Sequence, residues 1–298
     1  MGLEHARSAA SRHRGRLQGV LVLSAAVLVV EVVGGILTGS LALLADAGHM
    51  LTDVAGVGLA LLAVWLGARP PSTDRTYGLL RMEVLAAVLN AVLLLGVTAA
   101  IVVEAVRRLA GPSDVAGVPM LVVASIGLLA NAIGMWLLRE GKHESLNVRG
   151  AYLEVLGDLL GSLAVLAAAA VVALTGYERA DPIASLLVAV LILPRTWRLL
   201  REAVDILLQA TPRDVELEEV RRHIVETPQV RDVHDLHAWT LTSGVNVVSA
   251  HVVVEDGADP ARVLDRLCAC LQEDFDVEHS TLQLETEDRR RLEQAGHA

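Results

Sequence analysis

Cysteine and charged residues are scarce in this chain of 298 residues. Its two cysteines are too few for a disulfide scaffold, or for a zinc site built from four cysteines. Charged residues make up 20% of the chain and aromatic residues 3%, whereas 53% are hydrophobic. This composition excludes a disordered chain, which would be poor in apolar residues and rich in one charge. It is not the composition of two soluble domains either, although the length alone would allow them.

The chain also lacks the basic excess that a nucleic-acid binder needs. Its formal net charge is −10, and all of that net charge lies after residue 212, because acidic and basic residues balance before it. A nucleic-acid binder would show a basic face instead. We therefore expect no nucleic-acid partner. The charge pattern divides the chain into a neutral, very apolar part and an acidic C-terminal part.

Six stretches are apolar and long enough to cross a bilayer, which takes ~20 residues of helix. They span roughly residues 17–40, 41–66, 82–109, 118–138, 148–175 and 180–200. The breaks between them are polar or contain Gly and Pro. So many consecutive apolar runs argue against a soluble helical protein. The fold class is therefore an all-α membrane bundle of six helices over 17–208, with an N-terminal cytosolic arm over 1–16 and a cytosolic domain over 209–298.

The distribution of Lys and Arg predicts the orientation in the membrane, because these residues gather on the cytoplasmic side. With the N-terminus inside, the inner side holds Arg7, Arg12, Arg14, Arg16, Arg69, Arg75, Arg81, Arg139, Lys142, Arg149, Arg195, Arg198 and Arg201. The outer side holds only Arg107, Arg108 and Arg179. We expect a multi-pass protein of the cell (inner) membrane with both termini in the cytoplasm.

The C-terminal part has the pattern of a small α+β domain. An amphipathic helix over 214–226 is followed by strands over 230–240 and 246–255, joined by a turn at 242–244. Asp259 and Pro260 open a second helix that runs to about Phe275, and residues 277–285 alternate as a last strand. The order αββαβ resembles a metallochaperone.

Ionisable side chains occur inside two of the apolar stretches, where they are costly and usually functional. The second stretch holds His49 and Asp53, and the fifth holds Glu154 and Asp158. Each pair is spaced four apart and so lies on one face of its helix. One imidazole and three carboxylates suit a divalent first-row metal, and a tetrahedral site suits zinc. The alternative is a set of buried polar groups that satisfy one another between helices.

Asp46 lies on the same stripe, three residues before His49. It either guides a metal ion toward these four ligands, as a secondary metal residue, or hydrogen-bonds in the packing of the helices. Glu31, Asn90 and Asn131 lie in other apolar stretches, where they line a wet path or serve as interhelical hydrogen-bond partners.

Four runs of residues resemble the cation diffusion facilitator family, which exports zinc and related divalent metals. They are ADAGHMLTD at 45–53, TYG at 76–78 with Arg81 and Glu83, NVRGAYLEVLGD at 147–158, and VHDLHAW at 233–239. The resemblance extends over nearly the whole chain, in family order, and is nearest to the bacterial branch for zinc, cobalt and cadmium resistance. It implies a homodimer and proton antiport by alternating access, with a transport site between the second and fifth helices.

Carried over by position, the implied transport site is His49, Asp53, Glu154 and Asp158. Many zinc-selective members have a His where Glu154 stands, so Zn²⁺ is the first expectation for the substrate and Co²⁺, Cd²⁺ or Mn²⁺ remain open. The resemblance implies a transporter and not an enzyme. The alternatives are a manganese or iron transporter of the same mechanism, an intramembrane metalloenzyme, and a metal sensor without flux. Neither His-Glu-x-x-His nor Gly-x-Ser-x-Gly is present to support the metalloenzyme.

The C-terminal domain has its own candidate metal ligands. His234, His251 and Glu285, with Gln283 nearby, match the positions near which the family forms cytosolic metal sites. The alternative is a polar strand face without metal. Cys268 and Cys270 are two apart on a predicted helix and should point to different faces, which favours packing over a metal clip.

Overall fold

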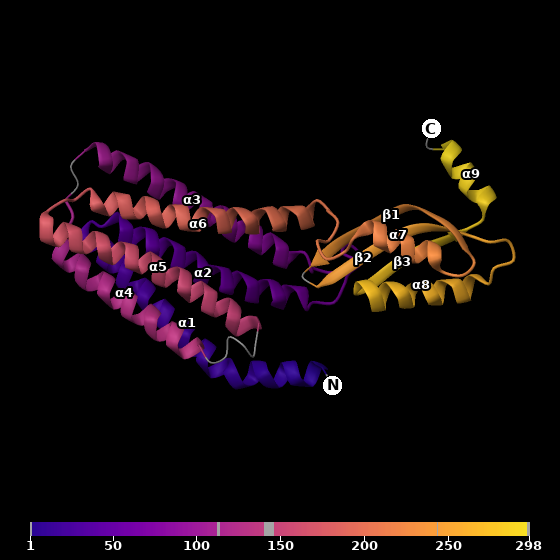
Figure 1. Ribbon diagram of the computed structural model, residues 1–298, viewed down its shortest axis with the longest axis horizontal. Coiled ribbons are helices and arrows are strands. Elements are labelled where there is room, and N and C mark those ends of the chain that lie inside the picture. The colour runs from indigo at the N-terminus through magenta and orange to yellow at the C-terminus, as the bar shows by residue number, and fades with distance from the viewer. Residues whose placement is uncertain (1, 112–113, 140–145, 243, 297–298) are drawn as a thin grey trace. The chain divides into compact units, whose positions relative to one another are not determined.

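Six long helices and a small α+β domain make up the computed structural model, which describes residues 2–111, 114–139, 146–242 and 244–296 (Figure 1). The long helices are α1 (Gly2–Thr38), α2 (Leu41–Gly67), α3 (Met82–Ala110), α4 (Gly117–Leu138), α5 (Leu146–Thr175) and α6 (Ala180–Leu207). All six are long and apolar enough to cross a membrane. The prediction of six spanning helices is confirmed, and α1 extends back to Gly2, through most of the predicted N-terminal arm.

The membrane helices bury small residues and expose large apolar ones. Their main core includes Ala42, Ala45, Ala124, Ala168 and Ala169, and small side chains of this kind let helices approach closely. Many large hydrophobic side chains on the same helices stay exposed, which suits a bundle surrounded by lipid tails. The chain is a multi-pass membrane protein.

The start of α2 is capped by a carboxylate from another helix. Asp181, fully buried in the first turn of α6, accepts hydrogen bonds from Ser40 Oγ at 2.6 Å, Leu41 N at 2.8 Å and Ala42 N at 3.1 Å. The first amides of a helix have no partner within it, so an outside acceptor is needed when the end is buried. This contact fixes where α2 begins, and therefore where the stripe that carries His49 and Asp53 lies.

The C-terminal domain is a two-layer α+β structure in the predicted order αββαβ. It comprises α7 (Leu217–Glu226), β1 (Val230–Thr242), β2 (Val245–Val254), α8 (Pro260–Phe275) and β3 (Val277–Glu285). The strands form one sheet in the order β1-β2-β3, with β1 antiparallel and β3 parallel to β2. Helix α7 begins three residues later than predicted, because Val215 N bonds to Pro212 O in a preceding turn. A further helix, α9 (Glu287–Gly296), was not predicted.

Helices α7 and α8 cover one face of this sheet. Val220 and Ile224 of α7 and Leu267 of α8 share a buried core with Val248 and Val252 of β2. Because side chains alternate along a strand, the neighbouring position His251 lies on the opposite face. The sheet therefore has one face covered by α7 and α8 and an opposite face that carries His251.

We expect Asp181→Ala to destabilise the membrane domain by about 1–3 kcal/mol, because it leaves the amides of Leu41 and Ala42 buried without an acceptor. Chemical unfolding of the purified protein in detergent measures this loss. Glu178→Ala is the matched control, since that carboxylate lies in the turn before α6 and makes none of these bonds. Equal stability of the two variants would contradict the capping role.

Candidate metal centre

Three of the four predicted membrane ligands lie together. His49 Nε2 is 3.5 Å from Asp53 Oδ2, one turn along α2, and 3.8 Å from Asp158 Oδ1 on α5. The ligand atoms of all three lie within 4.8 Å of one another. His49 and Asp158 are largely buried and Asp53 is partly exposed. An imidazole and two carboxylates at this separation supply three ligands for a divalent metal ion.

Glu154, the fourth predicted ligand, forms an ion pair with an arginine and is not part of this group of three. Its Oε1 accepts a hydrogen bond from Arg195 Nη2 of α6 at 3.1 Å, and the two side chains are 37% and 43% exposed. An exposed ion pair of this kind contributes only about 0.2–1 kcal/mol. The charge of Arg195 also acts on His49, Asp53 and Asp158. Arg195 therefore lies close to this acidic site, and its ion pair with Glu154 is weak.

Asp46 lies three residues before His49 on α2, and a chain of hydrogen bonds links it to α5 and then to α4. Ser162 Oγ donates to Asp46 Oδ2 at 3.2 Å, and Asn131 Nδ2 donates to Ser162 Oγ at 3.0 Å. A Cβ on Gly161 would come within 2.9 Å of Asp46 Oδ1, so glycine makes room for this carboxylate. Asp46 thus takes part in helix packing, which is one of its two predicted roles.

Glu31 adds another carboxylate beside Asp46. It is 1% exposed, and its Oε2 has no hydrogen-bond partner among the described residues. A Cβ on Gly127 of α4 would lie 2.5 Å from Glu31 Oε1. Burying two neighbouring carboxylates in an apolar bundle is costly unless protons or cations accompany them.

The candidate ligands of the C-terminal domain lie together on the face of the sheet opposite α7 and α8. His234 of β1 pairs in register with His251 of β2, which pairs with Gln283 of β3. Glu285, almost fully buried, lies 2.5 Å from His234 Nε2 and 3.7 Å from His251 Nδ1. Gln283 Nε2 donates a hydrogen bond to Glu285 Oε2 at 3.5 Å. Two imidazoles and a carboxylate here form a second group of possible ligands.

A bulge in β1 separates two histidines of the VHDLHAW run. Asp235 has a positive φ of 51°, and the pairing with β2 shifts between His234 and His237. The extra residue lets both Val233 and Leu236 face the core of the domain, and His237 Nε2 forms a hydrogen bond with Asp235 Oδ1 at 3.0 Å. This hydrogen bond holds the pKa of Asp235 below its usual range. Of this run, His234 is the residue that lies with His251 and Glu285 in one group of possible ligands.

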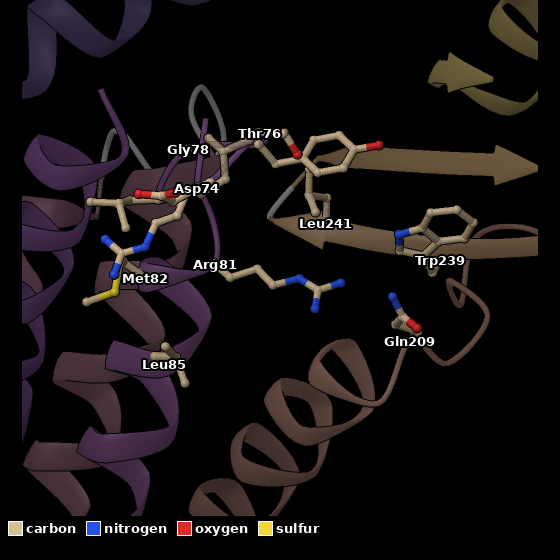
Figure 2. Close-up of a pocket in the computed structure, with 13 residues that line it drawn as sticks. Asp74, Thr76, Gly78, Arg81, Met82, Leu85, Gln209, Trp239 and Leu241 are labelled. Atoms are coloured by element: carbon tan, nitrogen blue, oxygen red, sulfur yellow. The ribbon is translucent and has the colours of Figure 1, made fainter. Parts of the chain in front are cut away.

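The other family motifs meet around a cavity of about 610 Å³ (Figure 2). The run Thr76-Tyr77-Gly78 and Arg81 line it together with Trp239 of β1. Figure 2 shows Arg81 extending toward Gln209. Nearby, Glu83 Oε2 accepts a hydrogen bond from Thr242 Oγ1 at 2.8 Å. These contacts join the loop after α2 and the start of α3 to β1.

Comparison with known proteins gives matches along the whole chain. The model of the cation efflux transmembrane domain matches residues 18–208, and that of the cytoplasmic domain of cation efflux proteins matches 212–287. This chain belongs to the cation diffusion facilitator family. As a member of that family, it is a metal cation efflux transporter.

Several relatives are similar over most of their length. The metal cation efflux system protein CzcD of Cupriavidus metallidurans is 42% identical over all of this chain and 94% of its own. The zinc transporter ZitB of Escherichia coli is 45% identical over 91% of this chain and 87% of its own. A solved metal-bound C-terminal domain of CzcD from the first bacterium is 43% identical, covering 24% of this chain and 99% of its own, with a TM-score of 0.23. These relatives are named as transporters, not as enzymes.

Sequence reasoning missed Arg195 as a neighbour of the membrane site in this facilitator. The sequence does contain a signal for it, since an arginine directly after Pro194 interrupts the sixth apolar stretch. The positive-inside rule uses this arginine only to predict orientation. The approach of α6 to α5 is a tertiary fact that helical spacing does not encode. Without it, Glu154 and Asp158 were expected to turn to the same ion.

We expect Arg195→Ala to bind a divalent ion about two- to fivefold more tightly, because Glu154 no longer has to leave an ion pair of about 0.5–1 kcal/mol. Competition with a chromophoric zinc chelator in detergent measures the affinity. Arg198→Ala, an exposed arginine three residues further along α6, is the matched control. Unchanged affinity in Arg195→Ala would show that Arg195 does not hold Glu154 from a shared ion.

Proposed function

We propose that this chain exports zinc from the cytosol in exchange for protons, with cobalt and cadmium as further substrates. The observation that carries this proposal is the group His49, Asp53 and Asp158, in which α2 and α5 bring an imidazole and two carboxylates within 4.8 Å in an apolar bundle. The names of two relatives support the choice of metals, since one is a zinc transporter and another, from Bacillus subtilis, is a cadmium, cobalt and zinc antiporter. The latter is 38% identical over 87% of this chain and 85% of its own.

Glu154 is proposed as the fourth ligand, recruited when the ion arrives. It lies one turn from Asp158 on the same face of α5, and its ion pair with Arg195 is half exposed and therefore weak. A dication competes with the single charge of the guanidinium and can bind all three carboxylates at once. Binding would then release Arg195, so that the site exchanges one positive partner for another.

Proton exchange follows from the ligands themselves. A carboxylate or imidazole that binds metal must have lost its proton, so metal binding and protonation exclude each other at Asp53, Asp158 and His49. Facing the cytosol, the deprotonated site binds metal. Facing outward, protons compete for the same atoms and the metal leaves. Alternating access of α2 and α5 between these two states gives antiport.

The sidedness of the protein is proposed from its arginines. Six spans would put both termini on one side of a bacterial inner membrane, and the excess of Lys and Arg in the loops of that side supports a cytoplasmic location for it. The match of residues 212–287 to the cytoplasmic domain of cation efflux proteins supports this orientation and assembly as a homodimer.

The group formed by His234, His251 and Glu285 is proposed as a cytosolic zinc site. Its two imidazoles come from neighbouring strands, and Glu285 is too buried to remain unpaired. The CzcD C-terminal domain, 43% identical, is described as metal-bound. Metal binding here would sense the supply of zinc on the side from which it is exported.

We expect Asp158→Asn to lower zinc flux in proteoliposomes by at least about tenfold, because changes even in groups that support metal ligands cost about 10–100-fold. An entrapped pH dye records the proton movement in the same vesicles. The exposed carboxylate of the loop after α2 gives the control, Asp74→Asn, which should transport normally. Normal flux in Asp158→Asn would contradict the proposed membrane site. Metal-dependent turnover of a lipid or peptide without metal flux would instead favour an enzyme.

We expect Glu154→His to shift selectivity toward zinc and away from manganese, because imidazole suits zinc and a carboxylate suits harder ions. The measurement is initial flux of Zn²⁺, Co²⁺, Cd²⁺ and Mn²⁺ at one fixed pH gradient. Glu154→Gln, which keeps the size but removes the charge, separates the loss of charge from the gain of an imidazole. An unchanged ranking of the four ions in Glu154→His would exclude Glu154 from the ligand set.

A further inference from the structure

A third group of possible metal ligands lies in the helical layer of the C-terminal domain, away from the two sites described above. His223 is in the last turn of α7, and Cys270 and Asp274 lie one turn apart on α8. All three side chains are partly or well exposed, so that ions can reach them from solvent. We propose that they bind a zinc or cadmium ion through a thiolate, an imidazole and a carboxylate, and that this ion clamps α7 to α8.

The three ligand atoms form a closed triangle. His223 Nδ1 is 3.3 Å from Asp274 Oδ2 and 3.7 Å from Cys270 Sγ, and Cys270 Sγ is 3.6 Å from the same Asp274 Oδ2. A tetrahedral zinc ion with bonds of about 2.3 Å to sulfur and about 2.0–2.1 Å to nitrogen and oxygen has N···O edges of roughly 3.3–3.4 Å and edges to sulfur of roughly 3.6 Å. The triangle therefore has the size of one face of such a tetrahedron, with a fourth position for water.

The geometry does not suit a nucleophile with its base. In such a relay the imidazole uses one nitrogen for the thiol and the other for the carboxylate. Here both short distances end on Nδ1 of His223. Burial, the hydrogen bond to Asp274 and the charges of Asp274 and Glu273 also raise the pKa of the Cys270 thiol, which keeps the free thiol protonated. A bound dication reverses this, because a coordinating thiol loses its proton.

The surrounding residues fix the ligands before an ion arrives. Phe275 meets the ring of His223 edge to face at 5.0 Å, which restrains the imidazole. The spacing of four along α8 places Cys270 and Asp274 on one stripe, beside the buried Leu271. A thiolate, a carboxylate and a neutral imidazole carry two negative charges, which a dication balances. The thiolate favours zinc and cadmium over manganese and magnesium.

The test uses the full-length, metal-free and reduced protein in detergent. In Cys268→Ser, Cys270 is the single remaining cysteine, so every thiol signal belongs to it. Cobalt or cadmium should then produce a thiolate-to-metal charge-transfer band in the ultraviolet, and Cys270→Ser with Cys268 intact should show none. The other two candidate sites contain no cysteine and cannot give this band.

A second measurement does not depend on removing Cys270. At a zinc concentration ten times the dissociation constant, alkylation of Cys270 in Cys268→Ser should slow about tenfold, because about one site in eleven is free. A chelator should restore the rate, and adding His223→Gln or Asp274→Asn should abolish the protection.

No charge-transfer band in Cys268→Ser, or an alkylation rate that zinc does not change, would overturn the proposal and leave a hydrogen-bonded trio. Zinc flux is measured separately. Failure here would leave the proposed transport untouched, and failure of transport would leave this site standing.

Discussion

Carboxylates buried between apolar helices are the constraint on which the membrane domain depends. Asp46 and Asp158 are almost completely buried, and Glu31 lies beside Asp46 with one oxygen that has no hydrogen-bond partner in the part of the chain that the structure describes. Negative charges in such surroundings are stable only with protons, metal ions or cationic side chains close by. Arg195 forms an ion pair with Glu154 at the edge of this group. The charge of the buried carboxylates has to be balanced by protons or cations.

The packing of α2 against α5 follows from the same constraint. Gly161 yields space to Asp46, and Ser162 and Asn131 extend a chain of hydrogen bonds from it into α4. The register of α2 is set by a third element, because Asp181 of α6 accepts the first amides of α2. A rotation of α2 that moved His49 and Asp53 would have to break this cap or leave it as the fixed end. The capped N-terminal end of α2 is therefore its most firmly anchored end.

Much of the architecture could be predicted from periodicity and composition. The six helices, the order αββαβ and the pairing of His49 with Asp53 all follow from the spacing of apolar and charged residues along one element. What escaped prediction depends on contacts between elements. Neither the ion pair of Glu154 with Arg195 nor the cap made by Asp181 has a local signal, since each joins residues that are far apart in sequence. The two cysteines illustrate what spacing can and cannot predict. Their spacing predicts different surroundings, and Cys268 does contact Ser280 while Cys270 contacts His223. That His223 is the neighbour of Cys270 depends on the packing of α7 against α8, which spacing does not encode.

The three groups of ligands differ in chemical softness, and the difference has a physical consequence. The membrane group has one imidazole and two carboxylates. The group on the sheet face opposite α7 and α8 has two imidazoles and the carboxylate of Glu285, and the group between α7 and α8 includes the thiol of Cys270. Soft ligands hold zinc and cadmium more firmly than carboxylates do, whereas a site that transports must release its ion. Oxygen-rich ligands that protons can displace therefore suit the membrane site. Nitrogen- and sulfur-containing ligands, which hold zinc and cadmium more firmly, suit the C-terminal domain, where no transport step has to release the ion.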